Sequence, residues 1–178
     1  MRGDSLLCEN RPSSITKAHA MPRSRSVLFA ISFVSFALVG VALYLQHAHD
    51  MLPCPLCVIQ RYAFLGIGFA ALIGALSHKI RGGAMIALLA ALGGLGTVGK
   101  HLYVLANPGF SCGIDPMETM LNKIPTATLL PWLFQADGLC ENATDGLFGL
   151  SIPQWSALWF VLLTIGLVWV LVSTRRAR

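Results

Sequence analysis

The sequence contains few charged residues. Only 12% of its 178 residues are charged, whereas 55% are hydrophobic, and an average soluble protein carries about 25% charged residues. Such a composition is typical of a protein that lies largely in lipid. The shortage is also uneven along the chain, because charged side chains are almost missing from several long stretches.

Four stretches are long and apolar enough to cross a membrane, for which a helix needs roughly 20 predominantly apolar residues. They are residues 27–46, 58–77, 84–105 and 155–172. The first and the last contain no charged residue, the second contains only Arg61, and the third is apolar until Lys100. The sequence therefore predicts an all-α membrane protein, a bundle of four transmembrane helices within residues 27–172, with any chemistry in the loops or at the helix ends.

The distribution of lysine and arginine predicts the orientation, because basic residues beside a span are retained in the cytoplasm. Basic residues occur in the tail at 1–26, in the turn at 77–83 and in the tail at 173–178, so we expect these regions on the cytoplasmic side. Residues 1–26 also lack the apolar run of a cleavable signal peptide, and we expect them to be disordered.

The two remaining loops are poor in basic residues and are expected to face outward. The loop at 47–57 has no lysine or arginine, and the loop at 106–154 has only Lys123. Within the longer loop, residues 117–136 are apolar but interrupted by Pro125 and Pro131, so we expect one or two short interfacial helices on the outer leaflet. The net charge of +5 then reflects this topology and not nucleic-acid binding.

Four of the five cysteines lie in the outward loops, where disulfides persist. These are Cys54, Cys57, Cys112 and Cys140, whereas Cys8 lies in the cytoplasmic tail and is expected to have no role.

The Cys54-Pro55-Leu56-Cys57 motif precedes the second span, so Cys57 is expected on the first turn of a helix, where the helix dipole favours a thiolate. Arg61 follows four residues later on the same helical face. A charged side chain inside a span is costly and is a functional candidate. Its partners would be the Cys57 thiolate and a carbonyl oxygen of a lipid-soluble electron acceptor; the alternative is an arginine that only snorkels to the headgroups.

Two further features have both a functional and a structural interpretation. His101, next to Lys100 near the outer end of the third span, is placed to donate to the same acceptor, or is an interfacial structural histidine. Cys112 and Cys140 either exchange electrons with the first pair or staple their loop, which would contribute roughly 3–4 kcal/mol. A four-cysteine zinc site is disfavoured, because only one pair has the short spacing, and we expect no metal.

The order of these features resembles the bacterial disulfide bond formation protein B (DsbB) family. The resemblance covers roughly residues 27–172 and includes the Phe148-Gly149-Leu150 and Pro153-Gln154-Trp155 segments before the fourth span. It implies an inner-membrane thiol oxidase with periplasmic loops at 47–57 and 106–154. Such an enzyme reoxidises a periplasmic DsbA-like dithiol oxidase and passes the electrons to ubiquinone, or to menaquinone under anaerobic conditions.

The resemblance also implies roles for individual residues. It implies the disulfides Cys54–Cys57 and Cys112–Cys140. Cys112 would be attacked by the DsbA-like protein, after which Cys140 would attack Cys54. Cys57 would then be the thiolate that hands electrons to the quinone, with Arg61 polarising the quinone and His101 close by.

Two alternatives stay open. A vitamin K epoxide reductase-like protein also couples loop cysteines to a quinone through a four-helix bundle, but its C-x-x-C pair follows the loop cysteines, whereas here it precedes them. A non-enzymatic tetraspan scaffold, with loops merely stapled by disulfides, would need no arginine on the Cys57 face.

Overall fold

The computed structural model describes residues 14–48, 53–107, 119–136, 138, 146–147 and 149–176. Most of this part of the chain is helical, with one short pair of strands. The elements in chain order are α1 (Ser14–Ala48), α2 (Pro55–Leu76), α3 (Ile80–Ala106), α4 (Thr119–Asn122), α5 (Pro125–Leu129), α6 (Pro131–Phe134), β1 (Gly146–Leu147), β2 (Leu150–Ser151) and α7 (Ile152–Arg176).

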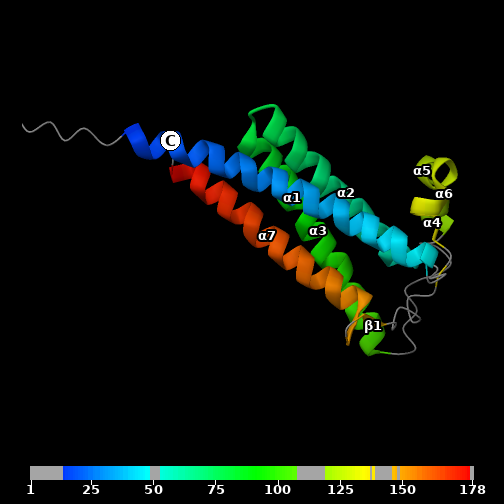
Figure 1. The fold of residues 1–178 in the computed structure, drawn as a ribbon. Coiled ribbons are helices and arrows are strands. Elements are labelled where there is room, and N and C mark those ends of the chain that lie inside the picture. The colour runs from blue at the N-terminus through cyan, green and yellow to red at the C-terminus, as the bar shows by residue number, and fades with distance from the viewer. Residues whose placement is uncertain are drawn as a thin grey trace, which may run out of the picture.

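The four long helices form an up-and-down bundle in which α1, α2, α3 and α7 pack side by side as a closed ring. The start of α1, the turn between α2 and α3 and the end of α7 lie at one end of the bundle, and α4–α6 and the strands lie at the other (Figure 1). Each long helix contains a stretch long and apolar enough to span a membrane; in α1 it is Arg23–Ala48. The predicted fold class, an all-α four-helix membrane bundle, is confirmed.

The surface of the bundle is apolar, as expected for helices that face lipid. Phe33 on α1 is 74% exposed, Leu89 on α3 is 69% exposed and Ile165 on α7 is 61% exposed. Water-soluble monomers rarely expose such extended apolar surfaces. The interior is also apolar, and at its centre the rings of Phe64 and Phe160 stack with centroids 4.1 Å apart.

Small residues allow the helices to approach closely at some positions of the bundle. A Cβ atom added at Gly83 would lie 2.5 Å from the Cα of Gly74, so the backbones of α2 and α3 touch there. At Gly94 an added Cβ would lie 2.2 Å from the Phe160 ring. The nearby Gly93 and Gly96 have nothing within 4 Å of an added Cβ, so of these three glycines of α3 only Gly94 is needed for packing.

Two features differ from the sequence prediction: the start of α1 and a short hairpin. The sequence predicts a disordered tail up to residue 26, but α1 begins at Ser14. The hairpin of β1 and β2 was not expected. It is antiparallel, with Leu147 opposite Leu150, and Gly149 in the turn has a φ of 81°, which glycine adopts readily.

The short helices α4, α5 and α6, which we call the cap, occupy the predicted interfacial segment. There are three of them instead of one or two, because Pro125 and Pro131 each begin a new helix at its first position, where proline is favoured. The cap packs on the first turns of α2. Tyr62 and Phe134 stack there with ring centroids 4.3 Å apart, so the cap covers the N-terminal end of α2.

Candidate functional site

The two cysteines of the C-x-x-C motif lie at the start of α2. Cys54 is the N-cap residue and Pro55 follows at the first helical position, where a missing N–H costs no helical hydrogen bond. The Cys54 Sγ accepts a hydrogen bond from the backbone N–H of Cys57 at 3.2 Å, and the two Sγ atoms lie 2.6 Å apart. The predicted position of Cys57 on the first turn is therefore the one observed, at the helix end where the dipole favours a thiolate.

The two sulfurs differ in environment. Cys54 is only 1% exposed, whereas Cys57 is partly exposed. The side-chain hydrogen bond with Cys57, together with burial, raises the pKa of the Cys54 thiol above its ordinary value. A thiol with a raised pKa keeps its proton at neutral pH, so Cys54 requires a base before its sulfur becomes a good nucleophile. Both are free thiols in the structure, and the disulfide between them stays a prediction.

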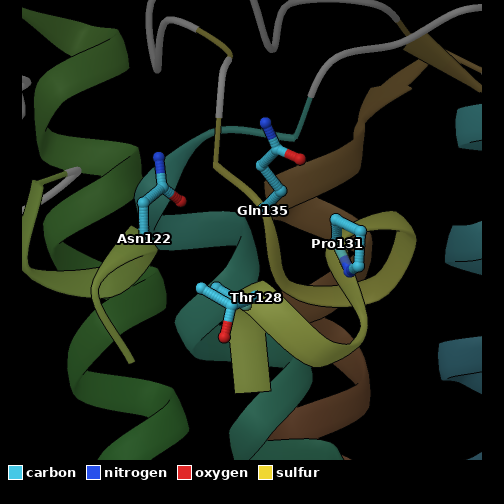
Figure 2. Close-up of a pocket in the computed structure, with 5 residues that line it drawn as sticks. Asn122, Thr128, Pro131 and Gln135 are labelled. Atoms are coloured by element: carbon cyan, nitrogen blue, oxygen red, sulfur yellow. The ribbon is translucent and has the colours of Figure 1, made fainter. Parts of the chain in front are cut away.

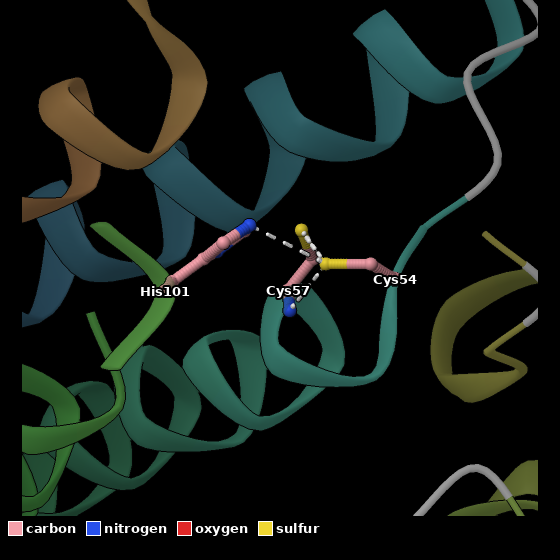
Figure 3. Close-up of side chains that lie close together, drawn as sticks. All are labelled: Cys54, Cys57 and His101. Carbon is pink, nitrogen blue, oxygen red and sulfur yellow. Dashed lines mark hydrogen bonds between the residues drawn. The ribbon is translucent and has the colours of Figure 1, made fainter. Parts of the chain in front are cut away.

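A histidine and a glutamine lie beside the sulfur pair. His101 reaches it from α3, with its Nε2 atom 3.8 Å from the Cys54 Sγ (Figure 3). On the other side of the ring, His101 Nδ1 lies 3.3 Å from the side-chain amide of Gln60 on α2. His101 is 0% exposed and Gln60 is 5% exposed. The chain Gln60–His101–Cys54 is therefore a buried polar connection between two transmembrane helices.

Arg61 lies one turn below Cys57 and is also buried, at 7% exposed. Its Nη1 donates a hydrogen bond to the carbonyl oxygen of Leu133 in the cap at 2.9 Å. Its charge also interacts with both sulfur atoms. Its Nε has no hydrogen-bond partner among the described residues. The side chain is thus covered by the cap, unlike an arginine that snorkels to the surface, and it retains a donor for a further acceptor.

Hydrogen bonds tie the cap and the residues after it to the start of α2. The Asn122 side chain makes two hydrogen bonds with the backbone of Ala136, donating to its carbonyl at 3.1 Å and accepting from its N–H at 3.0 Å. Gly138 then donates its N–H to the carbonyl of Pro53 at 3.1 Å. Because Pro53 directly precedes Cys54, this bond joins the segment after the cap to the segment before α2, beside the sulfur pair.

The cap also contains a hollow of about 340 Å³ (Figure 2). Residues from all three short helices, and Gln135 just after them, form its walls. The lining residues are Asn122, Ala127, Thr128, Pro131 and Gln135. The hollow is therefore shaped by the segment whose Leu133 carbonyl accepts from Arg61, and of the described cysteines neither Cys54 nor Cys57 lines it.

The Cys54, Cys57 and His101 side chains form the one group of possible metal ligands among the described residues, with their ligand atoms within 4.8 Å of one another. Two cysteines and a histidine are the donors of some zinc sites, but two thiolates bound tetrahedrally at about 2.3 Å lie about 3.8 Å apart. The observed 2.6 Å between the sulfurs suits an S–S redox pair better than a metal site.

The structure thus brings together four of the predicted site residues: Cys54, Cys57, Arg61 and His101. Lys100 is exposed and takes no part in the cluster. The positions of Cys8, Cys112 and Cys140 lie outside the described residues, so their predicted roles stay predictions. The sequence analysis missed Gln60, although a second polar residue next to Arg61 in an apolar span was a signal that could have identified it.

Comparison with known proteins places the chain in one family. The family model described as "Disulfide bond formation protein DsbB" matches residues 24–170. Two relatives named "Disulfide bond formation protein B" are similar over most of their length. The protein of Herminiimonas arsenicoxydans is 54% identical over 150 residues, 83% of this chain and 95% of the relative, and that of Ralstonia nicotianae is 46% identical over 157 residues, 86% and 97%. With a match of this extent to the model and to its members, the chain belongs to the DsbB family of disulfide bond formation proteins.

Proposed function

We propose that the protein is a quinone-dependent thiol oxidase, which forms disulfides de novo by reoxidising a periplasmic DsbA-like dithiol oxidase and delivering the electrons to ubiquinone. Relatives that carry the name "Disulfide bond formation protein B" support a disulfide-forming oxidoreductase. The quinone and the protein substrate come from the resemblance together with the geometry of the site.

One observation carries the proposal: a buried arginine lies beside a cysteine pair at the N-terminal end of α2. A buried guanidinium is costly unless it meets acceptors. Arg61 meets one carbonyl oxygen and keeps its Nε without a partner among the described residues. A quinone oxygen fits that orphaned donor. Arg61 would therefore hold the quinone next to Cys57, and the bound quinone would supply an acceptor for the two electrons that leave the sulfur pair.

The chain's own residues perform the thiol–disulfide steps. A thiolate of the DsbA-like protein attacks Cys112, forms a mixed disulfide and releases Cys140 as a thiolate. Cys140 attacks Cys54 in the Cys54–Cys57 disulfide, and Cys57 leaves as a thiolate. The N-terminal end of α2 and the Arg61 charge stabilise that anion. The second thiolate of the DsbA-like protein then forms its own disulfide and releases Cys112, and Cys112 attacks Cys140 in the Cys54–Cys140 bond and frees Cys54. Each exchange forms one S–S bond and breaks another, so no electrons are gained or lost until they leave from the reduced Cys54–Cys57 pair.

The loop connection supports the exchange between the two loops. Gly138 donates to the carbonyl of Pro53, Pro53 precedes Cys54 directly, and Cys140 follows Gly138 by two positions. We therefore propose that the exchange between the two cysteine pairs takes place where this hydrogen bond joins the two loops.

We further propose that the protein lies in the bacterial inner membrane with both termini in the cytoplasm. The end of the bundle with the sulfur pair would then face the periplasm, as the distribution of basic residues indicates. Labelling of Cys54 and Cys57 in intact cells with a thiol reagent that cannot cross the membrane tests this orientation. Labelling from the cytosolic side alone would exclude it.

The activity is tested with purified protein in a detergent that retains quinone, mixed with reduced DsbA-like protein and ubiquinone. We expect one quinone to be reduced for each dithiol oxidised. Cys57→Ser removes the electron-donating sulfur and should abolish the reaction, whereas Cys8→Ser is the matched control and should react like the wild type. Oxidation of the DsbA-like protein without quinone reduction would contradict the proposal, and an inert wild-type protein would favour the disulfide-stapled scaffold.

A further inference from the structure

Gln60 is a buried polar residue to which the proposed relay assigns no role. It lies at 5% exposure in the first turns of α2, next to Arg61 in the sequence, and its amide is 3.3 Å from Nδ1 of His101. Burying a side-chain amide in a transmembrane helix destabilises the fold unless the amide is hydrogen-bonded. Its observed partner is the ring that contacts Cys54, so Gln60 reaches the sulfur pair through His101.

The geometry of the ring favours proton transfer at Cys54. Nε2 of His101 lies 3.8 Å from the Cys54 Sγ, a distance over which sulfur and nitrogen share a weak hydrogen bond. The opposite ring nitrogen, Nδ1, lies 3.3 Å from the side-chain amide nitrogen Nε2 of Gln60. A half-turn of the amide exchanges its nitrogen and its oxygen without moving the rest of the side chain, and brings Oε1 to the same place. In that orientation Oε1 accepts from Nδ1–H, and Nε2 of His101 carries the lone pair and faces the thiol.

We propose that Gln60 is a positioning residue for the oxidase reaction: it holds His101 in the Nδ1–H tautomer so that Nε2 accepts the proton of Cys54. The inference rests on the proposed function. In the reduced pair, Cys54 carries a proton and Cys57 is a thiolate. The Cys54 S–H bond breaks and its proton passes to Nε2, a Cys54–Cys57 S–S bond forms, and two electrons leave to the quinone. His101 becomes an imidazolium, whose Nδ1–H remains hydrogen-bonded to Gln60.

Gln60 and Arg61 are neighbours on α2 but act on the sulfur pair in different ways. Arg61 contributes a fixed positive charge that acts on both sulfurs, and Gln60 contributes a neutral amide that acts through His101. The arginine has no proton to exchange near neutral pH, so it cannot serve as the base. His101 is the ionisable nitrogen that the described residues place against the Cys54 sulfur. Consecutive residues of α2 thus support the two functions: Arg61 stabilises charge directly, and Gln60 positions the histidine that accepts the proton.

The test compares three variants in the full-length protein. Gln60→Leu has a similar volume but no hydrogen-bonding group, Gln60→Glu keeps an oxygen that accepts from Nδ1–H, and Ser32→Ala removes a buried hydrogen bond to the Gly68 carbonyl elsewhere in the bundle. We expect Gln60→Leu to lower kcat about tenfold with both KM values unchanged, since one neutral hydrogen bond is removed. Gln60→Glu should restore kcat to within about threefold, and Ser32→Ala should leave it unchanged.

A second readout does not depend on quinone turnover. The ¹⁵N shifts of the His101 ring in the reduced protein report which nitrogen carries the proton; we expect Nδ1–H in the wild type and in Gln60→Glu, and a shift toward Nε2–H in Gln60→Leu. The same His101 tautomer in the wild type, Gln60→Glu and Gln60→Leu would overturn the inference. So would a wild-type kcat in Gln60→Leu, or an activity loss in that variant that appears only as a higher KM for quinone. If the wild type reduces no quinone, the proposed function fails, while the tautomer measurement still decides the role of Gln60.

Discussion

We expect Gly83→Ala to destabilise the bundle and Gly82→Ala, one residue away, to leave it intact. A Cβ atom at Gly83 would lie 2.5 Å from the Cα of Gly74 and 2.7 Å from the carbonyl oxygen of Ala70. Both are backbone atoms of α2, so neither can move without displacing the helix. A Cβ atom at Gly82 would meet nothing within 4 Å. The two neighbouring glycines therefore form a matched pair that differs in this contact.

The magnitude follows from the balance of two effects. Replacing glycine by alanine within a helix favours folding by about 0.5–1 kcal/mol, and this gain is common to both variants. Forcing extra volume into a packed interior typically costs about 1–3 kcal/mol. The difference in the free energy of unfolding between Gly82→Ala and Gly83→Ala therefore isolates the cost of the contact, and we expect it to be about 1–3 kcal/mol in favour of Gly82→Ala.

The measurement is reversible unfolding of the purified protein in mixed detergent, with increasing sodium dodecyl sulfate as the denaturant. The fluorescence of the four tryptophans follows the transition. Equal free energies for the two variants would show that α2 and α3 do not approach at this turn, and the helix pairing derived from Gly74 and Gly83 would then be wrong.

Three further outcomes are expected. Asn122→Ala removes both hydrogen bonds to the Ala136 backbone, a loss that costs about 1–3 kcal/mol. Amide hydrogen exchange of residues 134–136 should therefore become roughly tenfold faster or more, and unchanged exchange would mean that these two hydrogen bonds are not formed. Arg61→His should raise the apparent KM for quinone by about tenfold, which corresponds to about 1.4 kcal/mol of binding free energy. The KM for the protein substrate should stay the same, and an unchanged quinone KM would show that Arg61 does not bind the quinone. Cys140→Ser should accumulate a mixed disulfide through Cys112, and a trap on Cys54 instead would reverse the order of the relay.

Much of the fold was predictable because its signals are local in the sequence. Four apolar stretches of sufficient length predict four spans. Pro55 favours the first position of a helix, and a helix that begins there brings Cys54 and Cys57 together without any tertiary information. Arg61 was recognisable for the same reason, since a charge four residues into a span has few explanations.

The contacts between distant segments were not predictable. Whether Gln60 faces His101 depends on the rotation of α2 and α3 about their axes, which the pattern of apolar residues leaves loosely defined when a helix is apolar all round. The Gly138–Pro53 hydrogen bond joins two loops that are far apart in the chain, and it involves only backbone atoms, which leave no trace in residue types. The two-residue strands are too short for a periodicity signal.

The hydrogen bond from Arg61 to the Leu133 carbonyl links the cap to the side chain that is proposed to bind the electron acceptor. This carbonyl belongs to α6, within the loop that receives the protein substrate in the proposed relay. A displacement of α6 would break this bond and leave a second N–H of Arg61 available to another acceptor. A protein that binds the cap and a ligand that binds Arg61 would then influence each other's affinity.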